Sequence, residues 1–321
     1  MKKNNVITFR VCDKTQKMMS EELDWCKREK TPPYAKWQAK DGDTVITLYE
    51  SGKVVFQGSD ADLASDFWIS TEKINSGSVD IKNSSSKKND KLDKSIYVDP
   101  KIYNSSSIGS DEVGTGDYFG PIVVTASYVN KENISFLEEL GVKDSKKMTD
   151  DKILEIVPKI IKKIPYKSII LSNKEYNEKY NKEVNMNKIK AILHNKVLYS
   201  LREETTDYDY IIVDEFAKDF IYYNYLRDSA NVVKNITFLT KGESKNLAVA
   251  CASLISRYIF IKEFNKLSNE LSIELPKGAS DKVDEIAYYI AKNNGFDYLK
   301  NIAKMNFKNT LKVQEKLKES A

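Results

Sequence analysis

Apolar and polar positions in the first 75 residues alternate in short runs that are typical of strands joined by turns and helices. Within residues 45–58, two runs rich in β-branched and aromatic residues flank a Ser-Gly pair and predict a hairpin. We also predict strands at 6–9 and 34–40 and helices at 20–29 and 60–67. Together these elements predict a small α+β domain over residues 1–75.

The next stretch, residues 76–95, is rich in serine, lysine, asparagine and aspartate and has almost no large apolar side chains. Such a composition cannot bury enough apolar surface to offset the entropy lost on ordering. We therefore predict a flexible polar linker over 76–95. A structured lead-in near 96–98 then opens a second domain over 96–321.

In this second domain, runs of strand length alternate with runs of helical periodicity. Strands are predicted at 111–129, in two parts, and at 168–171, 208–214 and 237–239. A helix begins at Thr149, and Pro158 predicts a kink or an early end of that helix. A second helix, rich in small residues, begins near Lys245, and the chain is helical from about Asp284. This alternation predicts an α/β fold with helices flanking a mixed sheet.

The composition narrows the class of protein. The chain has 41% hydrophobic and 31% charged residues and a net charge of +4. It lacks an apolar run of about 20 residues, so we predict a soluble globular protein without a membrane partner. The amino terminus lacks a signal-peptide core, and the three cysteines are too scattered for a disulfide framework or a zinc site. We therefore expect a cytoplasmic location.

Residues 109–121 carry the first candidate chemistry. Asp111 and Glu112 are adjacent, and glycines and a proline follow them. Because neighbouring side chains of a strand point to opposite faces, these carboxylates share one site only where the strand ends or bends. Gly114 and Gly116 give the backbone that freedom. The alternatives are a site for a hard divalent cation and an ordinary acidic turn.

Two more acids follow predicted strands. Asp214 ends the strand at 208–214, where open α/β sheets bind ligands, and Glu243 lies in the turn before the helix of small residues. Alone, Asp214 fits a helix cap and Glu243 an acid that complements a helix dipole. Brought together, however, four carboxylates repel one another unless cations lie between them. Two metals about 4 Å apart can support displacement at a phosphoryl group.

The only histidine, His194, lies in a predicted amphipathic helix. A single imidazole excludes mechanisms and zinc sites that need several histidines. We interpret His194 as a packed or hydrogen-bonded helix residue in preference to a member of a catalytic site.

At these motifs the chain resembles bacterial ribonuclease HIII, a type 2 ribonuclease H. The resemblance rests on residues 109–121, on Asp144-Ser145-Lys146-Lys147-Met148-Thr149, on Val213-Asp214-Glu215-Phe216-Ala217 and on Thr240-Lys241-Gly242-Glu243-Ser244. It implies a ribonuclease H-like sheet, preceded by a small domain similar to one repeat of the TATA-binding protein. The implied activity is metal-dependent hydrolysis of the RNA strand of RNA–DNA hybrids, with Mg²⁺ or Mn²⁺. The implied catalytic and metal-binding acids are Asp111, Glu112, Asp214 and Glu243. We expect a monomer without an obligate protein partner.

The resemblance also implies contacts with the substrate. Ser145 and Lys146 are candidates for phosphate contact, with a capping turn and an exposed lysine as the alternative. Backbone amides of Gly114, Thr115 and Gly116 would approach a phosphate or a 2′-hydroxyl. In the first domain we favour a substrate-gripping strand over an ordinary packed strand. Its candidate contact residues are Tyr34, Lys36, Trp37, Gln38 and Lys40.

Three functions remain open: a nuclease for hybrids, a nuclease of the related HII type that incises DNA at single ribonucleotides, and a non-catalytic hybrid-binding protein. Thr115, Phe119-Gly120-Pro121 and Glu243 resemble the HIII branch, since the HII branch usually has Arg and Asp at the first and last of these positions. Residues 275–279 also lack the tyrosine of the HII motif. Clustered acids argue against a pure binder of phosphates. Met305-Asn306-Phe307 departs from the leucine, histidine and phenylalanine of many relatives.

Overall fold

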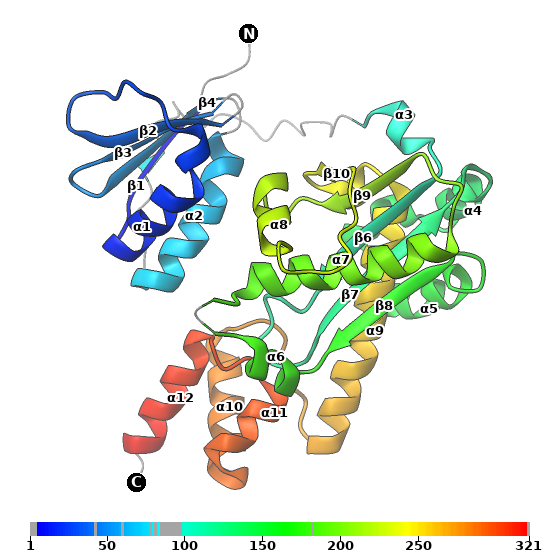
Figure 1. Ribbon diagram of the computed structural model, residues 1–321. Helices are drawn as coiled ribbons and strands as arrows, with labels where there is room; N and C mark the ends of the chain where they lie inside the picture. Colours follow the sequence, from blue (N-terminus) through cyan, green and yellow to red (C-terminus); the bar gives the residue numbers. More distant parts are fainter. Residues whose placement is uncertain are drawn as a thin grey trace. The chain divides into compact units, whose positions relative to one another are not determined.

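The computed structural model describes residues 5–41, 44–58, 61–77, 79, 82–83, 98–181 and 183–319 (Figure 1). The chain divides into two compact units, Met1–Lys94 and Ser95–Ala321. Among the described residues, no helix combines the length and the apolar character needed to cross a membrane.

The first unit is a five-stranded antiparallel sheet of order β2-β3-β4-β1-β5 with two helices. Alternate residues of its strands are buried on one face, where the rings of Phe9 and Phe56 stack with centroids 5.6 Å apart. The elements are β1 (Asn5–Arg10), α1 (Asp13–Glu22), β2 (Ala35–Asp41), β3 (Thr44–Tyr49), β4 (Lys53–Gly58), α2 (Ala61–Ser76) and β5 (Lys82–Asn83). The small α+β fold matches the sequence prediction.

Three details of this unit differ from the prediction. The helix predicted at 20–29 lies earlier, because α1 begins at Asp13 and only a 3₁₀ turn, Asp24–Cys26, follows its end. The helix predicted to end at residue 67 continues to Ser76. Within the predicted linker, β5 pairs with β1 at Ile7 and Thr8. Residues 84–97, including most of the predicted lead-in, lie outside the described residues.

The second unit is built on a mixed sheet of order β10-β9-β6-β7-β8. The pairs β6–β9 and β9–β10 are parallel, whereas β6–β7 and β7–β8 are antiparallel. The strands are β6 (Ser107–Val113), β7 (Ile122–Val129), β8 (Tyr166–Leu171), β9 (Tyr210–Asp214) and β10 (Ile236–Leu239). This sheet confirms the predicted α/β class with a mixed sheet.

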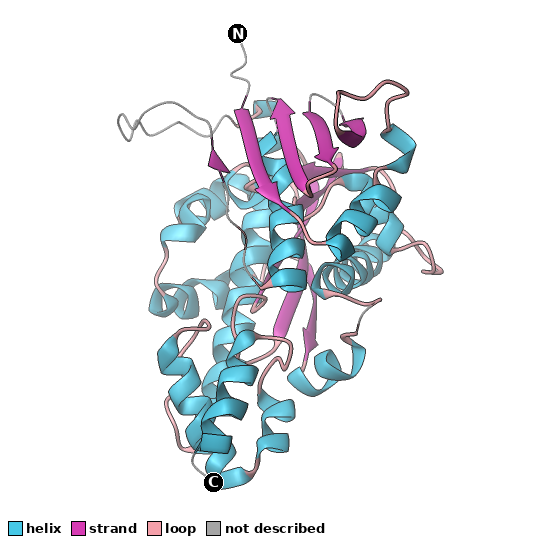
Figure 2. Ribbon diagram, turned by 90° about the vertical axis from the view of Figure 1, so that its left-hand side faces the viewer, coloured by secondary structure: helices cyan, strands magenta, loops and turns pink. Residues whose placement is uncertain are grey.

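Helices cover both faces of this sheet (Figure 2). One face packs against α6 (Asn173–Lys179) and α7 (Met186–Glu204), and the other packs against α4 (Ile134–Glu139), α5 (Asp150–Ile160) and α9 (Leu247–Leu271). A further apolar cluster joins the end of α9 to the carboxyl-terminal helices. The remaining helices are α3 (Pro100–Tyr103), α8 (Asp219–Tyr225), α10 (Asp281–Asn294), α11 (Leu299–Ile302) and α12 (Lys308–Glu319).

Gly109 is the reason that α9 lies so close to the sheet. A Cβ atom at Gly109 would lie 2.3 Å from the backbone nitrogen of Val249, at the start of the helix. The first turns of α9 are made of small buried residues, as the sequence suggested. Ser127 of β7 also donates a hydrogen bond to the carbonyl oxygen of Ala248, at 2.7 Å. The start of α9 is thereby fixed against β6, the strand that carries the paired acids.

The structure corrects one helix prediction and refines another. Pro158 lies inside α5 without ending it, because it falls in the last turn, where only one intrahelical hydrogen bond is lost. The carboxyl-terminal region is helical as predicted but is divided among α10, α11 and α12, because α10 ends before Gly295, whose φ of +88° is unfavourable for other residues.

Candidate active site

The four predicted acids lie at the carboxyl ends of the parallel strands and in the turn after β10. The β6–β9 ladder ends at the pair Ser110–Val213, so Asp111 and Asp214 both follow directly after the last paired residues. Asp214 also ends β9, where it pairs with Leu239 of β10. This is the edge at which open α/β sheets bind ligands.

Asp111 and Glu112 face opposite sides of the sheet. The antiparallel pairing of β6 with β7 continues to Val113, so the strand does not end at the acids on that side, contrary to the prediction. Asp111 lies on the α9 side, where its carbonyl oxygen accepts a hydrogen bond from Ser256 at 3.2 Å. The Glu112 side chain turns towards α7, and the site therefore reaches both faces of β6.

Asp214 and Glu243 are linked through a tight 3₁₀ turn, Gly242–Ser244. The Gly242 nitrogen donates a hydrogen bond to Oδ1 of Asp214 at 2.6 Å. A Cβ atom at Gly242 would lie 3.3 Å from that same oxygen, so a glycine suits this close approach. Glu243, the next residue, is buried at 4% exposure. The turn therefore places Glu243 directly after the residue that bonds to Asp214.

The charges of these acids disturb one another. Burial, followed by the charges of Glu112 and Asp214, raises the pKa of Asp111 well above its usual range. Burial and the charges of Glu243 and Glu112 raise the pKa of Asp214 to about 6, against the hydrogen bond from Gly242. Raised values of this kind indicate carboxylates held close together without enough positive charge between them.

Two lysines supply part of that positive charge. Lys146 Nζ lies 2.5 Å from Oε1 of Glu243, and Lys190 Nζ forms an ion pair with Oε1 of Glu112. Among the described residues, no group of three or more acidic, histidine or cysteine side chains is arranged so that it could hold a metal ion. The four acids nevertheless offer hard, negatively charged carboxylate oxygens, and Mg²⁺ and Mn²⁺ prefer such donors.

His194 is buried and touches one of the four acids. Its Nε2 lies 2.9 Å from Oε2 of Glu112, and its Nδ1 lies 2.8 Å from Oγ of Ser110. Our interpretation of a packed, hydrogen-bonded residue describes its surroundings but missed its contact with Glu112. We also missed Lys190, although its spacing of four residues from His194 places both on one face of α7.

The loop that follows Asp111 and Glu112 begins with a glycine that the backbone requires. Gly114 has a φ of +90°, and a Cβ atom there would lie 2.2 Å from the carbonyl oxygen of Pro121. Thr115 is half-buried and Gly116 is exposed. Gly116 has no positive φ and no close neighbour, so the predicted need for glycine holds at 114 and not at 116.

The carboxyl-terminal segments fasten this loop through its backbone. Tyr118 donates its N–H to the carbonyl oxygen of Gly278, and the Gly278 nitrogen donates to Oδ1 of Asp117. The fully buried Lys304 donates from Nζ to the carbonyl oxygens of Asp117 and Gly120, at 2.8 and 2.6 Å. Burial lowers the pKa of Lys304 to about 7, although Asp117 opposes this shift.

The second predicted substrate segment forms a 3₁₀ turn, Val142–Lys147. Ser145, a candidate for phosphate contact, is buried at 5% exposure. Lys146 has a side chain that is 61% exposed and reaches Glu243. Nearby, Asp150 at the start of α5 forms ion pairs with Arg257 and Lys277.

The strand predicted to grip substrate, β2, is divided between exposed and buried residues. Tyr34 is 80% exposed with a φ of +64°, and Lys36 and Lys40 are exposed. Trp37 is 7% exposed, so the predicted stacking of its ring on a base is not available in this structure. The buried Gln38 amide is engaged too: it donates to Thr47 at 2.9 Å and accepts from Arg28 at 2.8 Å. The pairing of β2 with β3 shifts register between Ala35 and Trp37.

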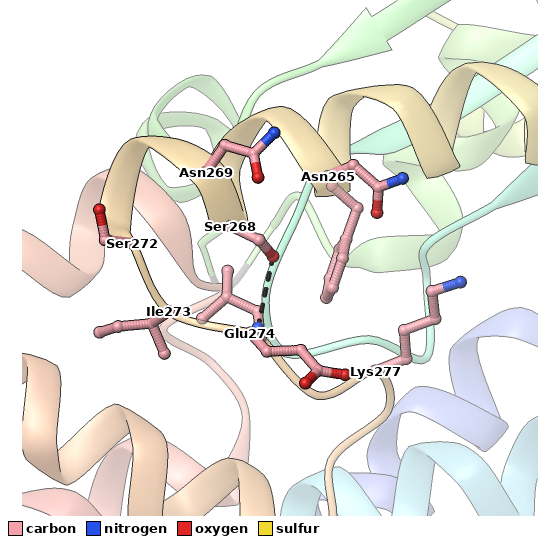
Figure 3. A pocket seen from close by; sticks show the side chains of 9 residues that line it. Asn265, Ser268, Asn269, Ser272, Ile273, Glu274 and Lys277 are labelled. Atoms are coloured by element: carbon pink, nitrogen blue, oxygen red, sulfur yellow. Dashed lines mark hydrogen bonds between the residues drawn. The ribbon is translucent and has the colours of Figure 1, made fainter.

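A polar groove of about 650 Å³ lies beside the end of α9 (Figure 3). Asn265, Asn269 and Ser272 line one side, and Glu274 and Lys277 lie on the chain that leads to Gly278. None of the four acids lines it. The groove is therefore separate from the candidate active site.

Known proteins resemble both units of this chain. The family model for ribonuclease HII matches residues 108–310, and the model for a domain of unknown function (DUF3378) matches residues 6–80. The ribonuclease HIII of Staphylococcus aureus strain MSSA476 is 39% identical over 315 residues, which cover 97% of this chain and 98% of that protein.

Solved structures of ribonucleases HIII also resemble this chain. The crystal structure of Bst-RNase HIII in complex with Mn²⁺ has 36% sequence identity and a TM-score of 0.67, and the match covers 99% of this chain and 100% of that chain. The structure of Aquifex aeolicus RNase H3, at 21% identity and a TM-score of 0.52, covers 93% of this chain and 99% of that one and supports the fold alone. From its motifs, its mixed sheet and these relatives, we conclude that the chain belongs to the bacterial ribonuclease HIII family.

Proposed function

We propose that Asp111, Glu112, Asp214 and Glu243 bind divalent metal ions and carry the ribonuclease H activity of this chain. The substrate is the RNA strand of an RNA–DNA hybrid. The observation that carries the proposal is the pattern of charge at the carboxyl ends of β6 and β9. Burial and mutual repulsion raise the pKa of Asp111 and Asp214, and lysines lie on the other two acids.

Each acid has a distinct place in the proposed mechanism. Asp111 and Asp214 would hold metal between the ends of neighbouring strands, and Glu243 would add a ligand from the turn after β10. Glu112 would contribute from the α7 side of β6. When bound, two divalent ions supply an activated water and stabilise the leaving oxygen in an in-line displacement at phosphorus. Lys146, on a largely exposed side chain, would neutralise charge on a phosphate beside Glu243.

A cleavage assay tests this proposal directly. We expect the protein to cut the RNA strand of a labelled RNA–DNA hybrid in Mg²⁺ or Mn²⁺, and to stop when a chelator removes the metal. Restoring the metal in excess should restore cleavage, which excludes irreversible damage by the chelator. Cleavage at an undiminished rate in the chelator would contradict the proposed metal site.

The loop after the acids would recognise the RNA strand. Gly114, Thr115 and Gly116 lie directly after β6, and the far side of the loop is fastened by the carboxyl-terminal segments. Backbone amides at this position would contact 2′-hydroxyls or phosphates of successive nucleotides. We also propose that the protein acts in the cytoplasm as a monomer, since neither the site nor the loop requires a residue from a second chain.

The first unit would add affinity for the hybrid without taking part in the chemistry. All four acids lie in the second unit, beyond the proposed linker. Tyr34, just before β2, and Lys36 and Lys40 within it are exposed, and β4, which lies beyond β3 in the sheet, begins with the exposed Lys53. Cationic side chains along a strand, with an exposed aromatic ring at its start, suit contacts with a phosphate backbone.

Replacing both Lys36 and Lys40 with alanine should weaken hybrid binding and flatten its dependence on salt. Each lost phosphate contact reduces the slope of log K against log[salt] by about 1. Binding measured by fluorescence anisotropy at several salt concentrations checks this expectation. The double variant Lys14→Ala/Lys17→Ala removes the same charge from the exposed side of α1 and is the matched control. Equal slopes for the two double variants would contradict a substrate-gripping role for β2.

A further inference from the structure

The Glu112 carboxylate is held on both of its oxygens by one helix. Lys190 Nζ pairs with Oε1, and His194 Nε2 lies 2.9 Å from Oε2. Both residues come from α7, four positions apart, and project from the same face of that helix. Ser110, two residues before Glu112 on β6, holds the other nitrogen of the imidazole at 2.8 Å.

The aromatic ring of Phe216 contacts both Lys190 and His194. Phe216 lies under both α7 side chains: the Lys190 ammonium is 4.1 Å from its ring centroid, and the His194 ring stacks on it at 5.1 Å. Cation–π and stacking contacts of this kind restrict where the ammonium and the imidazole can move. Phe216 follows Asp214 by two residues, so Lys190 also contacts the segment that carries a second candidate metal-binding acid.

Lys190 differs from Lys146 in its freedom to move. The side chain of Lys190 is 10% exposed, whereas that of Lys146 is 61% exposed. Lys146 can therefore leave Glu243 for a phosphate or give way to an arriving metal ion. Lys190 is far less exposed, and its ammonium lies between Glu112 and the ring of Phe216. We therefore expect its positive charge to stay beside Glu112 when metal is bound.

We propose that Lys190 is a positioning residue that fixes the orientation of Glu112 and, by occupying one of its oxygens with a positive charge, also lowers the affinity of the site for divalent metal. The proposal rests on the proposed function, in which Glu112 belongs to the metal-binding set. Two opposite effects follow when the ammonium group is removed. The carboxylate loses its fixed orientation, so turnover falls, while the site loses a competing cation, so metal binds more tightly.

The test is a comparison of metal binding and turnover in two variants of the full-length protein. In Lys190→Met, Mn²⁺ titrated calorimetrically without substrate should bind more tightly than in the natural protein, and kcat on a hybrid should fall by about 10- to 100-fold. Lys190→Gln removes the charge but keeps a hydrogen-bond donor near Oε1. It should show the tighter Mn²⁺ binding and a kcat between those of Lys190→Met and the natural protein.

Lys196→Met is the matched control, because it removes a lysine from an exposed position of the same helix. It should change neither quantity. A merely structural role for Lys190 predicts weaker Mn²⁺ binding together with slower turnover, and this outcome in both Lys190 variants would overturn the proposal. Unchanged kcat in Lys190→Met would overturn it as well.

A further variant separates this inference from the proposed function. Asp111→Asn should lose most of the Mn²⁺ binding if the acids form the metal site. If Asp111→Asn binds Mn²⁺ like the natural protein, the proposed site itself fails. If Asp111→Asn loses binding but Lys190→Met does not gain it, the metal site stands and only the role of Lys190 is rejected.

Discussion

Asp214→Asn should lower kcat for an RNA–DNA hybrid by on the order of 10³-fold, the equivalent of several kcal/mol of lost transition-state stabilisation. Asparagine keeps an oxygen that can accept the hydrogen bond from Gly242, so the turn that carries Glu243 should keep its shape. What is lost is one negative charge where the proposed metal ions are held. Single-turnover kinetics under saturating enzyme would separate this loss from any change in substrate binding.

The same substitution should stabilise the fold slightly. Burial and the neighbouring carboxylates make the charged form of Asp214 unfavourable, so a neutral side chain relieves repulsion. Thermal unfolding without metal should therefore show a midpoint at or above that of the natural protein. Asp219→Asn, at the exposed start of α8, is the matched control and should cut the hybrid at the natural rate. Near-natural turnover in Asp214→Asn would remove Asp214 from the proposed site.

Duplex DNA that contains a single ribonucleotide should be cut on the order of 10² times more slowly than a hybrid with a long ribonucleotide run, a cost typical of imperfect positioning. In the HII pattern, the segment at residues 275–279 would contact a lone ribonucleotide. In this chain that segment already bonds to the loop after β6. Gly278 bonds to both Tyr118 and Asp117, and residues 275–279 contain no tyrosine to place against a deoxyribose. With Thr115 in the loop, correct placement should depend on several successive 2′-hydroxyls.

A series of duplexes with one, two, four and eight consecutive ribonucleotides, otherwise identical in sequence, measures this dependence. The cleavage rate in Mg²⁺ should rise with the length of the ribonucleotide run until the loop has formed all its contacts with 2′-hydroxyls. Equal rates on the first and last members of the series would move the protein towards the HII type of activity.

The positions of the acids were predictable because local patterns determine them. A short apolar run that ends in an aspartate places Asp214 at a strand end, and a small-residue helix after Glu243 places that turn against the sheet. Both patterns lie within a few neighbouring residues. The roles of these acids as catalytic and metal-binding groups stay a prediction until the variants are measured.

What the sequence did not reveal depends on contacts between distant segments. Lys190 and His194 reach Glu112 only because α7 crosses the face of β6, and their sequence spacing is equally typical of an ordinary helix. Trp37 and Gln38 were predicted to face substrate, but both are buried, and the Gln38 amide bonds to Thr47 and Arg28. Burial of a polar amide cannot be recognised until its partners are known.

The fastening of the loop by Lys304 has a consequence for how the protein is made. Lys304 and Asp117 are 187 positions apart in sequence, and the loop is synthesised long before the side chain that holds its carbonyl oxygens. A nascent chain that already carries Asp111, Glu112, Asp214 and Glu243 still lacks the support that shapes the loop beside them. We therefore expect chains truncated before Lys304 to be inert towards hybrids, because the loop beside the acids then lacks this support.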